Sequence, residues 1–199
     1  MTASVLPNDN IIVLSLPEAG MNDRQFFELC QLNPDLKIER NAAGQLIIMS
    51  PTGSRTGNWN SILNGLLFVW NNQARLGKTF DSSTGFRLPN GATYGPDAAW
   101  VTNEKWDALS PEEQERFAPV VPEFIIELRS RHDELEALQA KIGEFIACGC
   151  RLAWLVDPYE RCTLVYEGEQ PPYAVPFEEV LHGGEVLPGF EVRLEEVLR

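Results

Sequence analysis

Residues 122–141, "PEFIIELRSRHDELEALQAK", begin as a buried β-strand and end as an amphipathic helix. Apolar side chains occupy both faces of 124–128, because neighbouring side chains point to opposite sides of a strand. This pattern is typical of an internal strand that is covered on both sides. Glu127 stands within the apolar run, where an unpaired carboxylate would cost several kcal/mol. The sequence therefore predicts a partner for this charge.

Arg129 is one candidate partner, because it lies two residues after Glu127 and points to the same side of the strand. In that interpretation the two residues form an ion pair at the rim of a sheet. In the alternative interpretation, Glu127 belongs to a site whose other members come from distant parts of the chain.

Asp97 is the second carboxylate of interest. It lies in "YGPDAAWV", residues 94–101, after a Gly-Pro turn and before an apolar strand. An aspartate there commonly caps a turn. If its strand is the neighbour of 124–128, however, the carboxylates of Asp97 and Glu127 lie within ~5 Å of each other. Two such groups repel unless they are protonated or bridged by a cation, and Mg²⁺ or Mn²⁺ suits oxygen ligands of this kind.

Lys141 lies on the helix that follows Glu127. The helix has one apolar stripe, formed by Leu135, Leu138, Ile142, Phe145 and Ile146. At 100° per residue, Lys141 is roughly 80° from the centre of this stripe. It either snorkels to the surface and pairs with Glu144, or leans over the sheet toward the carboxylates, where its charge can orient a water or stabilise a phosphorane.

Elsewhere the hydrophobic pattern alternates between helical and strand periodicity, which indicates one α/β domain with a mixed β-sheet flanked by helices. We expect residues 1–21 to form an irregular arm and residues 22–199 to form a single domain. The expected elements are a helix capped by Asn22, a hairpin in 36–51, a long helix in 55–77 closed by Gly77, strands in 78–89 and 93–101, a short helix opening at Ser110–Pro111, and further strands after residue 150.

The composition limits the classes of protein to which this chain can belong. The net charge of −13 disfavours broad contacts with nucleic acid, since phosphate contacts need Lys and Arg. No apolar stretch approaches the roughly 18 residues that a membrane span needs, and the first residues lack the pattern of a secretory signal. The four cysteines fit no zinc pattern. We therefore expect a cytoplasmic protein with reduced thiols and no contact with a membrane.

Four stretches together resemble the Uma-type family of restriction-endonuclease-like proteins, which is similar to a branch of the PD-(D/E)XK nuclease superfamily. They are "PTGSRTG", "GPDAAWV", "FIIELRSRHDELEALQAKIGEFIACGCRLAWLVDP" and "GGEVLPGFEVRL". The resemblance implies a restriction-endonuclease-like fold from about residue 22 to the end. Pro96-Asp97 matches the first element of the superfamily motif and Glu127 matches the second.

The superfamily has a lysine two residues after the second carboxylate, whereas this chain has Arg129. The resemblance implies that Lys141 takes the place of that lysine and that Glu39 is an early metal-binding carboxylate. In the alternative interpretation, Glu39 is a solvent-facing residue of its strand. It also implies metal-assisted phosphodiester hydrolysis, in which Asp97 and Glu127 hold Mg²⁺ and the ion activates a water. Lys141, with Arg129, would then balance the developing charge.

Two functional hypotheses remain open at this point. The first is a metal-dependent endonuclease acting on DNA, a reading that extends to RNA or smaller phosphate esters because these share the same site. The second is a catalytically inactive nuclease-fold module for binding or assembly, which the net charge and Arg129 favour. A homodimer would supply the two sites that cleavage of a duplex needs.

Overall fold

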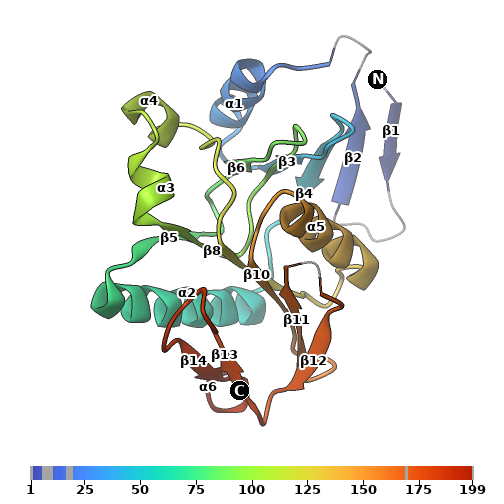
Figure 1. The fold of residues 1–199 in the computed structure, drawn as a ribbon. Coiled ribbons are helices and arrows are strands. Elements are labelled where there is room, and N and C mark those ends of the chain that lie inside the picture. Colours follow the sequence, from blue (N-terminus) through green and yellow to red (C-terminus); the bar gives the residue numbers. More distant parts are fainter. Residues whose placement is uncertain (1, 6–10, 17–19, 169, 199) are drawn as a thin grey trace.

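The structure is a computed structural model that describes residues 2–5, 11–16, 20–168 and 170–198. Two six-stranded sheets and one small hairpin carry the strands, and helices lie against them (Figure 1). The predicted α/β architecture with a mixed sheet flanked by helices is confirmed. The strands are arranged so that the stretch 122–141 lies at the centre of the fold.

The central sheet has the order β12-β11-β10-β9-β8-β5. Its strands are β5 (Gly77–Asp81), β8 (Ala98–Thr102), β9 (Phe124–Leu128), β10 (Leu152–Asp157), β11 (Cys162–Glu167) and β12 (Tyr173–Pro176). β9 and β10 run parallel, whereas the other neighbouring pairs are antiparallel. All five residues of β9 are buried, as its apolar pattern predicts for an internal strand.

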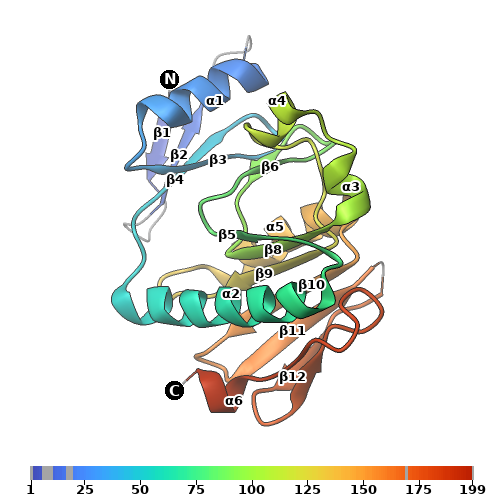
Figure 2. The same cartoon turned by 90° about the vertical axis from the view of Figure 1, so that its left-hand side faces the viewer.

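Two helices cover opposite faces of this sheet, α2 (Ser54–Ala74) and α5 (Leu135–Ala147). The α2 side is visible in Figure 2, where the helix runs along the sheet. Leu63 and Leu67 of α2 pack with the side chains of Phe124 and its neighbours on one face. The other face packs against α5; its core contains Ala99, Val101, Ile125, Ala153, Leu155, Ile142 and Phe145. Burial of both faces explains why β9 and β10 are almost wholly apolar.

The second sheet has the order β1-β2-β4-β3-β7-β6. Its strands are β1 (Thr2–Val5), β2 (Ile11–Ser15), β3 (Lys37–Arg40), β4 (Leu46–Met49), β6 (Phe86–Arg87) and β7 (Thr93–Tyr94). The predicted hairpin is β3–β4. The expectation of an irregular arm is wrong for residues 2–5 and 11–15, because β2 pairs with both β1 and β4. Backbone hydrogen bonds to the edge of β4 that β3 does not occupy give residues 11–15 their extended form.

The short elements follow their local signals. They are α1 (Asp23–Leu32), α3 (Asn103–Asp107), α4 (Pro111–Gln114), β13 (Val180–His182), β14 (Glu191–Arg193) and α6 (Leu194–Val197). Asn22 and Ser110 both cap their helices in capping boxes, as the sequence predicts. β13 pairs with β14, and Leu181 and Val192 from this hairpin join the core on the α2 side.

The four cysteines are free thiols, in agreement with the expected reduced state. In the parts of the chain that the structure describes, no helix combines the length and apolar character required to cross a membrane.

Gly77 does not close α2 as predicted. The helix ends at Arg75, which adopts the left-handed conformation with φ of 56°, and Gly77 begins β5. The Asn71 side chain holds this corner, because it accepts a hydrogen bond from the Gly77 N–H and donates one to the Gly77 carbonyl. Gly77 is needed for close packing instead: a Cβ atom there would lie 2.2 Å from the Val101 carbonyl oxygen and 2.6 Å from Trp100 Cε2.

We expect Gly77→Ala to lower the free energy of unfolding by about 3 kcal/mol, because backbone and a buried indole cannot easily move away from the new methyl group. Urea unfolding measures the change. Gly65→Ala is the matched control, since Gly65 is on the exposed side of α2 and its Cβ would meet no atom within 4 Å. The control should gain about 0.5–1 kcal/mol. An equal effect of both substitutions would contradict this packing role.

Candidate active site

Asp97 directly precedes β8, and Glu127 lies on the neighbouring strand β9. β8 pairs with β9 in an antiparallel register that joins Ala98 to Ile126, so Asp97 stands at the level of Glu127. Glu127 lies on the same face of β9 as Ile125, the face that α5 covers, whereas Asp97 directly precedes β8 and contacts α2. The electrostatic influence of Asp97 on Glu127 agrees with this proximity.

Hydrogen bonds from two elements fix Asp97. Its Oδ1 accepts a hydrogen bond from Asn60 Nδ2 of α2 at 2.9 Å, and its Oδ2 accepts one from the Leu128 N–H at 2.8 Å. Asn64, one turn after Asn60, donates to the Asp97 carbonyl at 2.8 Å. These contacts connect α2 to the end of β9, which differs from a simple turn cap. Neither asparagine was predicted from the sequence; their signal is a four-residue spacing, which places both on the same side of α2.

Lys141 reaches from α5 to the carboxylates. Its Nζ lies 2.8 Å from Glu127 Oε1 and 2.9 Å from Glu39 Oε1. It also donates a hydrogen bond to the Gly95 carbonyl at 3.2 Å. The side chain is only 11% exposed. Of the two interpretations of Lys141, the structure therefore supports the one in which the lysine leans over the sheet.

Glu39 of β3 is buried, with 4% of its surface exposed, so it is not a solvent-facing strand residue. Its Oε1 accepts hydrogen bonds from Lys141 and from the Gly95 N–H, the latter at 2.9 Å. The Gly95 peptide thus contacts both members of the pair. A side chain at Gly95 would place a Cβ 3.0 Å from the Thr84 carbonyl oxygen, so this peptide is tightly confined.

The buried position of Glu127 changes its acidity. Desolvation raises the pKa of its carboxyl; Lys141 opposes this effect, whereas Asp97 and Glu39 reinforce it, and the resulting pKa is about 7. Desolvation alone would lower the pKa of Lys141, but the negative charges of Glu127 and Glu39 outweigh it and raise that pKa. The lysine is therefore a permanent cation.

Arg129 does not join this cluster. Its Nη1 pairs with Asp157 Oδ2 of β10 at 2.6 Å, and its Nε donates to the Asp133 carbonyl at 3.4 Å. Instead of the predicted rim pair between Glu127 and Arg129, Glu127 pairs with Lys141 and Arg129 pairs with Asp157. Glu144, the predicted surface partner of Lys141, accepts hydrogen bonds from Tyr94 and Asn90 instead.

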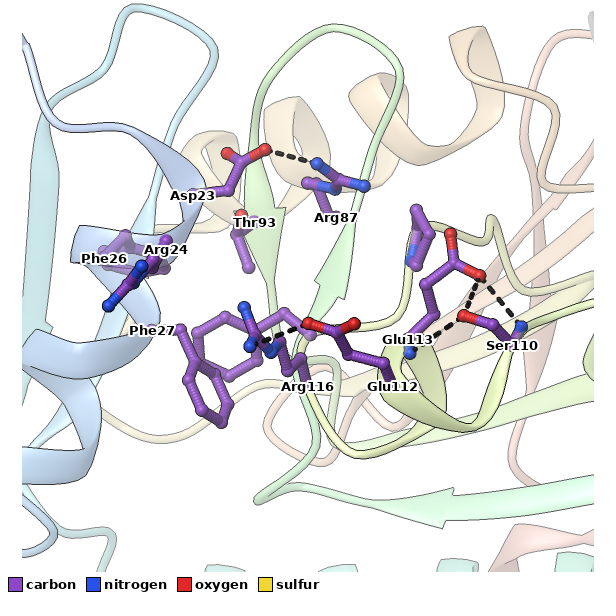
Figure 3. A pocket seen from close by; sticks show the side chains of 12 residues that line it. Asp23, Arg24, Phe26, Phe27, Arg87, Thr93, Ser110, Glu112, Glu113 and Arg116 are labelled. Carbon is purple, nitrogen blue, oxygen red and sulfur yellow. Dashed lines mark hydrogen bonds and ion pairs between the residues drawn. The ribbon is translucent and has the colours of Figure 1, made fainter.

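A cleft of about 490 Å³ leads to the cluster, because Glu39, Tyr94 and Gly95 form part of its wall. A second pocket of about 340 Å³ lies between α1 and α4 (Figure 3). It shares Thr93 and Phe117 with the cleft, but its lining does not include Glu39, Asp97, Glu127 or Lys141. Its charged side chains neutralise one another, as in the contacts of Arg87 with Asp23 and of Arg116 with Glu112.

The chemistry of the donor set can be compared with that of a metal ion. Within the described ranges, no group of three or more His, Cys, Asp or Glu side chains is arranged to hold a metal. The ligand set of Asp97, Glu127 and Glu39 stays a prediction; Lys141 contacts both Glu39 and Glu127, so Glu39 pairs with the lysine. Two carboxylates remain, and Glu127 Oε1 is a buried oxygen in ion-pair distance of Lys141 but without a hydrogen bond of good geometry. Two carboxylates with an available oxygen fit Mg²⁺, which commonly takes its other ligands from water and substrate phosphate.

The raised pKa of Glu127 predicts a pH-dependent loss of stability. Between the pKa of an unfolded glutamate, about 4.3, and the folded pKa of about 7, Glu127 binds more protons in the folded state than in the unfolded state. Stability from this group is therefore present at low pH and is lost as the pH rises through 7. In a chelator-containing buffer, the unfolding free energy of the wild type should fall between about pH 5 and pH 8 more steeply than that of Glu127→Gln. Parallel pH profiles in urea titrations would contradict the assignment.

Comparison with known proteins identifies the family. Residues 23–195 match Uma2, described as "Putative restriction endonuclease". A crystal structure of a "putative nuclease belonging to DUF820" from Anabaena variabilis ATCC 29413 shares the fold, with a TM-score of 0.73 and 16% identity over 89% of this chain and 97% of that chain. A search of curated proteins found no match. Since the family match extends over most of the chain, the protein belongs to the Uma2 family.

Proposed function

We propose that this protein is a metal-dependent endonuclease that hydrolyses phosphodiester bonds in DNA. The observation that carries the proposal is the buried lysine, Lys141, which two glutamates hold next to a cleft that Glu39 lines. A purely structural core would gain little from this arrangement, because apolar residues of similar volume are often as stable as buried ion pairs. Clusters of buried ionisable groups with a perturbed pKa are typical of functional sites.

Asp97 and Glu127 would hold Mg²⁺ or Mn²⁺. When bound, such an ion lowers the pKa of a coordinated water and polarises a phosphate oxygen. The contribution of the protein is orientation: Asn60 and the Leu128 N–H hold Asp97 in place before any ion arrives. Preorganised ligands of this kind reduce the reorganisation that binding requires.

Lys141 would act on the phosphate itself. Its Nζ carries a permanent positive charge, which can orient an attacking water and stabilise the negative charge that develops on the phosphoryl oxygens. Glu39 and the Gly95 carbonyl hold this Nζ in position. Arg129 has a more distant role in this proposal, since its pair with Asp157 fixes the end of β9 next to Glu127.

A second candidate function is a nuclease-fold module that binds or assembles without catalysis. Arg129 favours it, because the cation at the motif position is engaged with Asp157 and cannot serve as a neutral base. The net charge of −13 also disfavours extended contacts with DNA. Metal binding and cleavage distinguish the two candidates.

Metal binding predicts a thermal shift. Mg²⁺ or Mn²⁺ at about 100 times its Kd should stabilise the wild type by about 2.7 kcal/mol, or roughly 5–10 °C in Tm. Asp97→Asn should lose most of this shift, because a neutral amide replaces a charged ligand. Asp107→Asn serves as the control, since Asp107 is an exposed residue at the end of α3. If Asp97→Asn kept the full shift, these carboxylates would not hold the ion.

Catalysis predicts nicking of supercoiled plasmid DNA with Mg²⁺ or Mn²⁺, and Lys141→Met should abolish it while the metal-induced rise in Tm persists. The substitution leaves two buried carboxylates without their cation and should cost about 3–5 kcal/mol. The assay is therefore run at a temperature at which circular dichroism shows the variant folded. Lys78→Met, at an exposed position of β5, is the control. Nicking at the wild-type rate by Lys141→Met would remove the lysine from the mechanism.

A further inference from the structure

The cleft beside the candidate active site has one basic side chain in its wall. Its charged lining residues are Asp35, Lys37 and Glu39. Lys37 and Glu39 are two residues apart on β3, so their side chains project from the same face of the strand. Glu39 contacts Lys141 inside the protein. Lys37 is the first residue of β3, two residues before Glu39. Lys37 is also close enough to lower the pKa of Glu127 through its charge.

The four lysines of the chain differ in their surroundings. Lys105 pairs with Glu123 at 2.9 Å, and Lys141 pairs with two glutamates. Lys78 is exposed on β5. Lys37 is half-buried, and within the described ranges its ammonium makes no ion pair or hydrogen bond. A half-buried cation without a partner, beside a cleft and a carboxylate site, is available to an anionic ligand.

The turn between β5 and β6 offers hydroxyl groups to the same cleft. Ser82, Ser83 and Thr84, in the turn between β5 and β6, line it. Ser83 donates to Asp81, whereas the hydroxyls of Ser82 and Thr84 make no hydrogen bond within the described part of the chain. This turn packs against Gly95, whose peptide holds Glu39 and Lys141. Ser and Thr hydroxyls are frequent phosphate ligands in nucleic-acid complexes.

Building on the proposed nuclease function, we propose that Lys37 binds a phosphate of the substrate strand within this cleft, which the hydroxyls of residues 82–84 also line, and that the substrate strand enters without its complement. The substrate class is thus single-stranded DNA, or a single-stranded stretch of a longer molecule. Lys37 would hold the strand while the neighbouring phosphate reaches Lys141 and the carboxylates.

Size and charge favour a single strand. The cleft volume of about 490 Å³ is that of a small-molecule site, not of a channel for a duplex. A duplex carries one negative charge per about 1.7 Å of axis, twice the density of one strand. On a body with a net charge of −13, each additional phosphate adds repulsion. A strand that presents few phosphates to Lys37 and to a bound cation avoids most of this cost.

Equilibrium binding of a fluorescein-labelled oligothymidine of roughly a dozen nucleotides tests the proposal by fluorescence anisotropy at low salt with EDTA. The chelator prevents metal-dependent cleavage, so the measurement does not depend on activity. Lys37→Gln should weaken binding about tenfold. It should also reduce the slope of log K against log salt by roughly 0.7, the value for one phosphate contact of a single strand. Lys37→Arg should restore most of the affinity, and Lys78→Gln should behave as the wild type.

Several outcomes would overturn the proposal. They are absence of binding by the wild type, equal losses in the Lys37→Gln and Lys78→Gln variants, and an unchanged salt slope. A duplex of the same length that competes as well as the single strand would overturn the substrate class. The result is separate from a cleavage test on the same oligothymidine with Mg²⁺ or Mn²⁺. Lys37-dependent binding without cleavage of this single strand would leave the cleft assignment intact and remove catalysis, whereas cleavage without such binding would do the reverse.

Discussion

The ion pairs of Lys141 with Glu39 and Glu127 connect three elements that are far apart in the sequence. They bring together β3 of one sheet, β9 of the other and helix α5. Each charge would be costly alone in this environment, and each is tolerated because the others are present. The relative positions of the two sheets and the helix are therefore coupled to the geometry of the site. Any displacement of α5 would leave the glutamates unpaired, so the fold can hold the lysine in one position.

Asp97 adds a second constraint, which connects the central sheet to helix α2. Its carboxylate is held by Asn60 of α2 and by the backbone of Leu128, and its carbonyl is held by Asn64. The helices on both faces thus place polar side chains at the same end of β8 and β9. One helix supplies neutral amides that orient a carboxylate, and the other supplies a cation. This division explains how charged groups can meet between two apolar cores without disturbing either.

Local patterns predicted much of this structure. The apolar run of β9, the stripe of α5 and the caps at Asn22 and Ser110 each depend on neighbours within a few residues, and the structure has all four. What failed depended on distant contacts. Pairing with β4 makes a strand of residues 11–15, and packing against Trp100 determines the role of Gly77. Likewise, the partners of Arg129 and Glu39 come from β10 and α5, so no pattern within their own strands could identify them.

Arg129 and Lys141 have different partners because of where β9 and β10 end. The residue two positions after Glu127 lies beyond the last residue of β9, and its backbone N–H still bonds to Val156 of the parallel strand β10. An arginine there meets Asp157, which directly follows Val156, and is drawn away from Glu127. The space next to Glu127 is then open to a side chain from the helix that covers this face of the sheet, and that helix is α5. A flexible lysine suits that approach, because its four-carbon stem can cross the apolar layer while its compact charge meets two carboxylates.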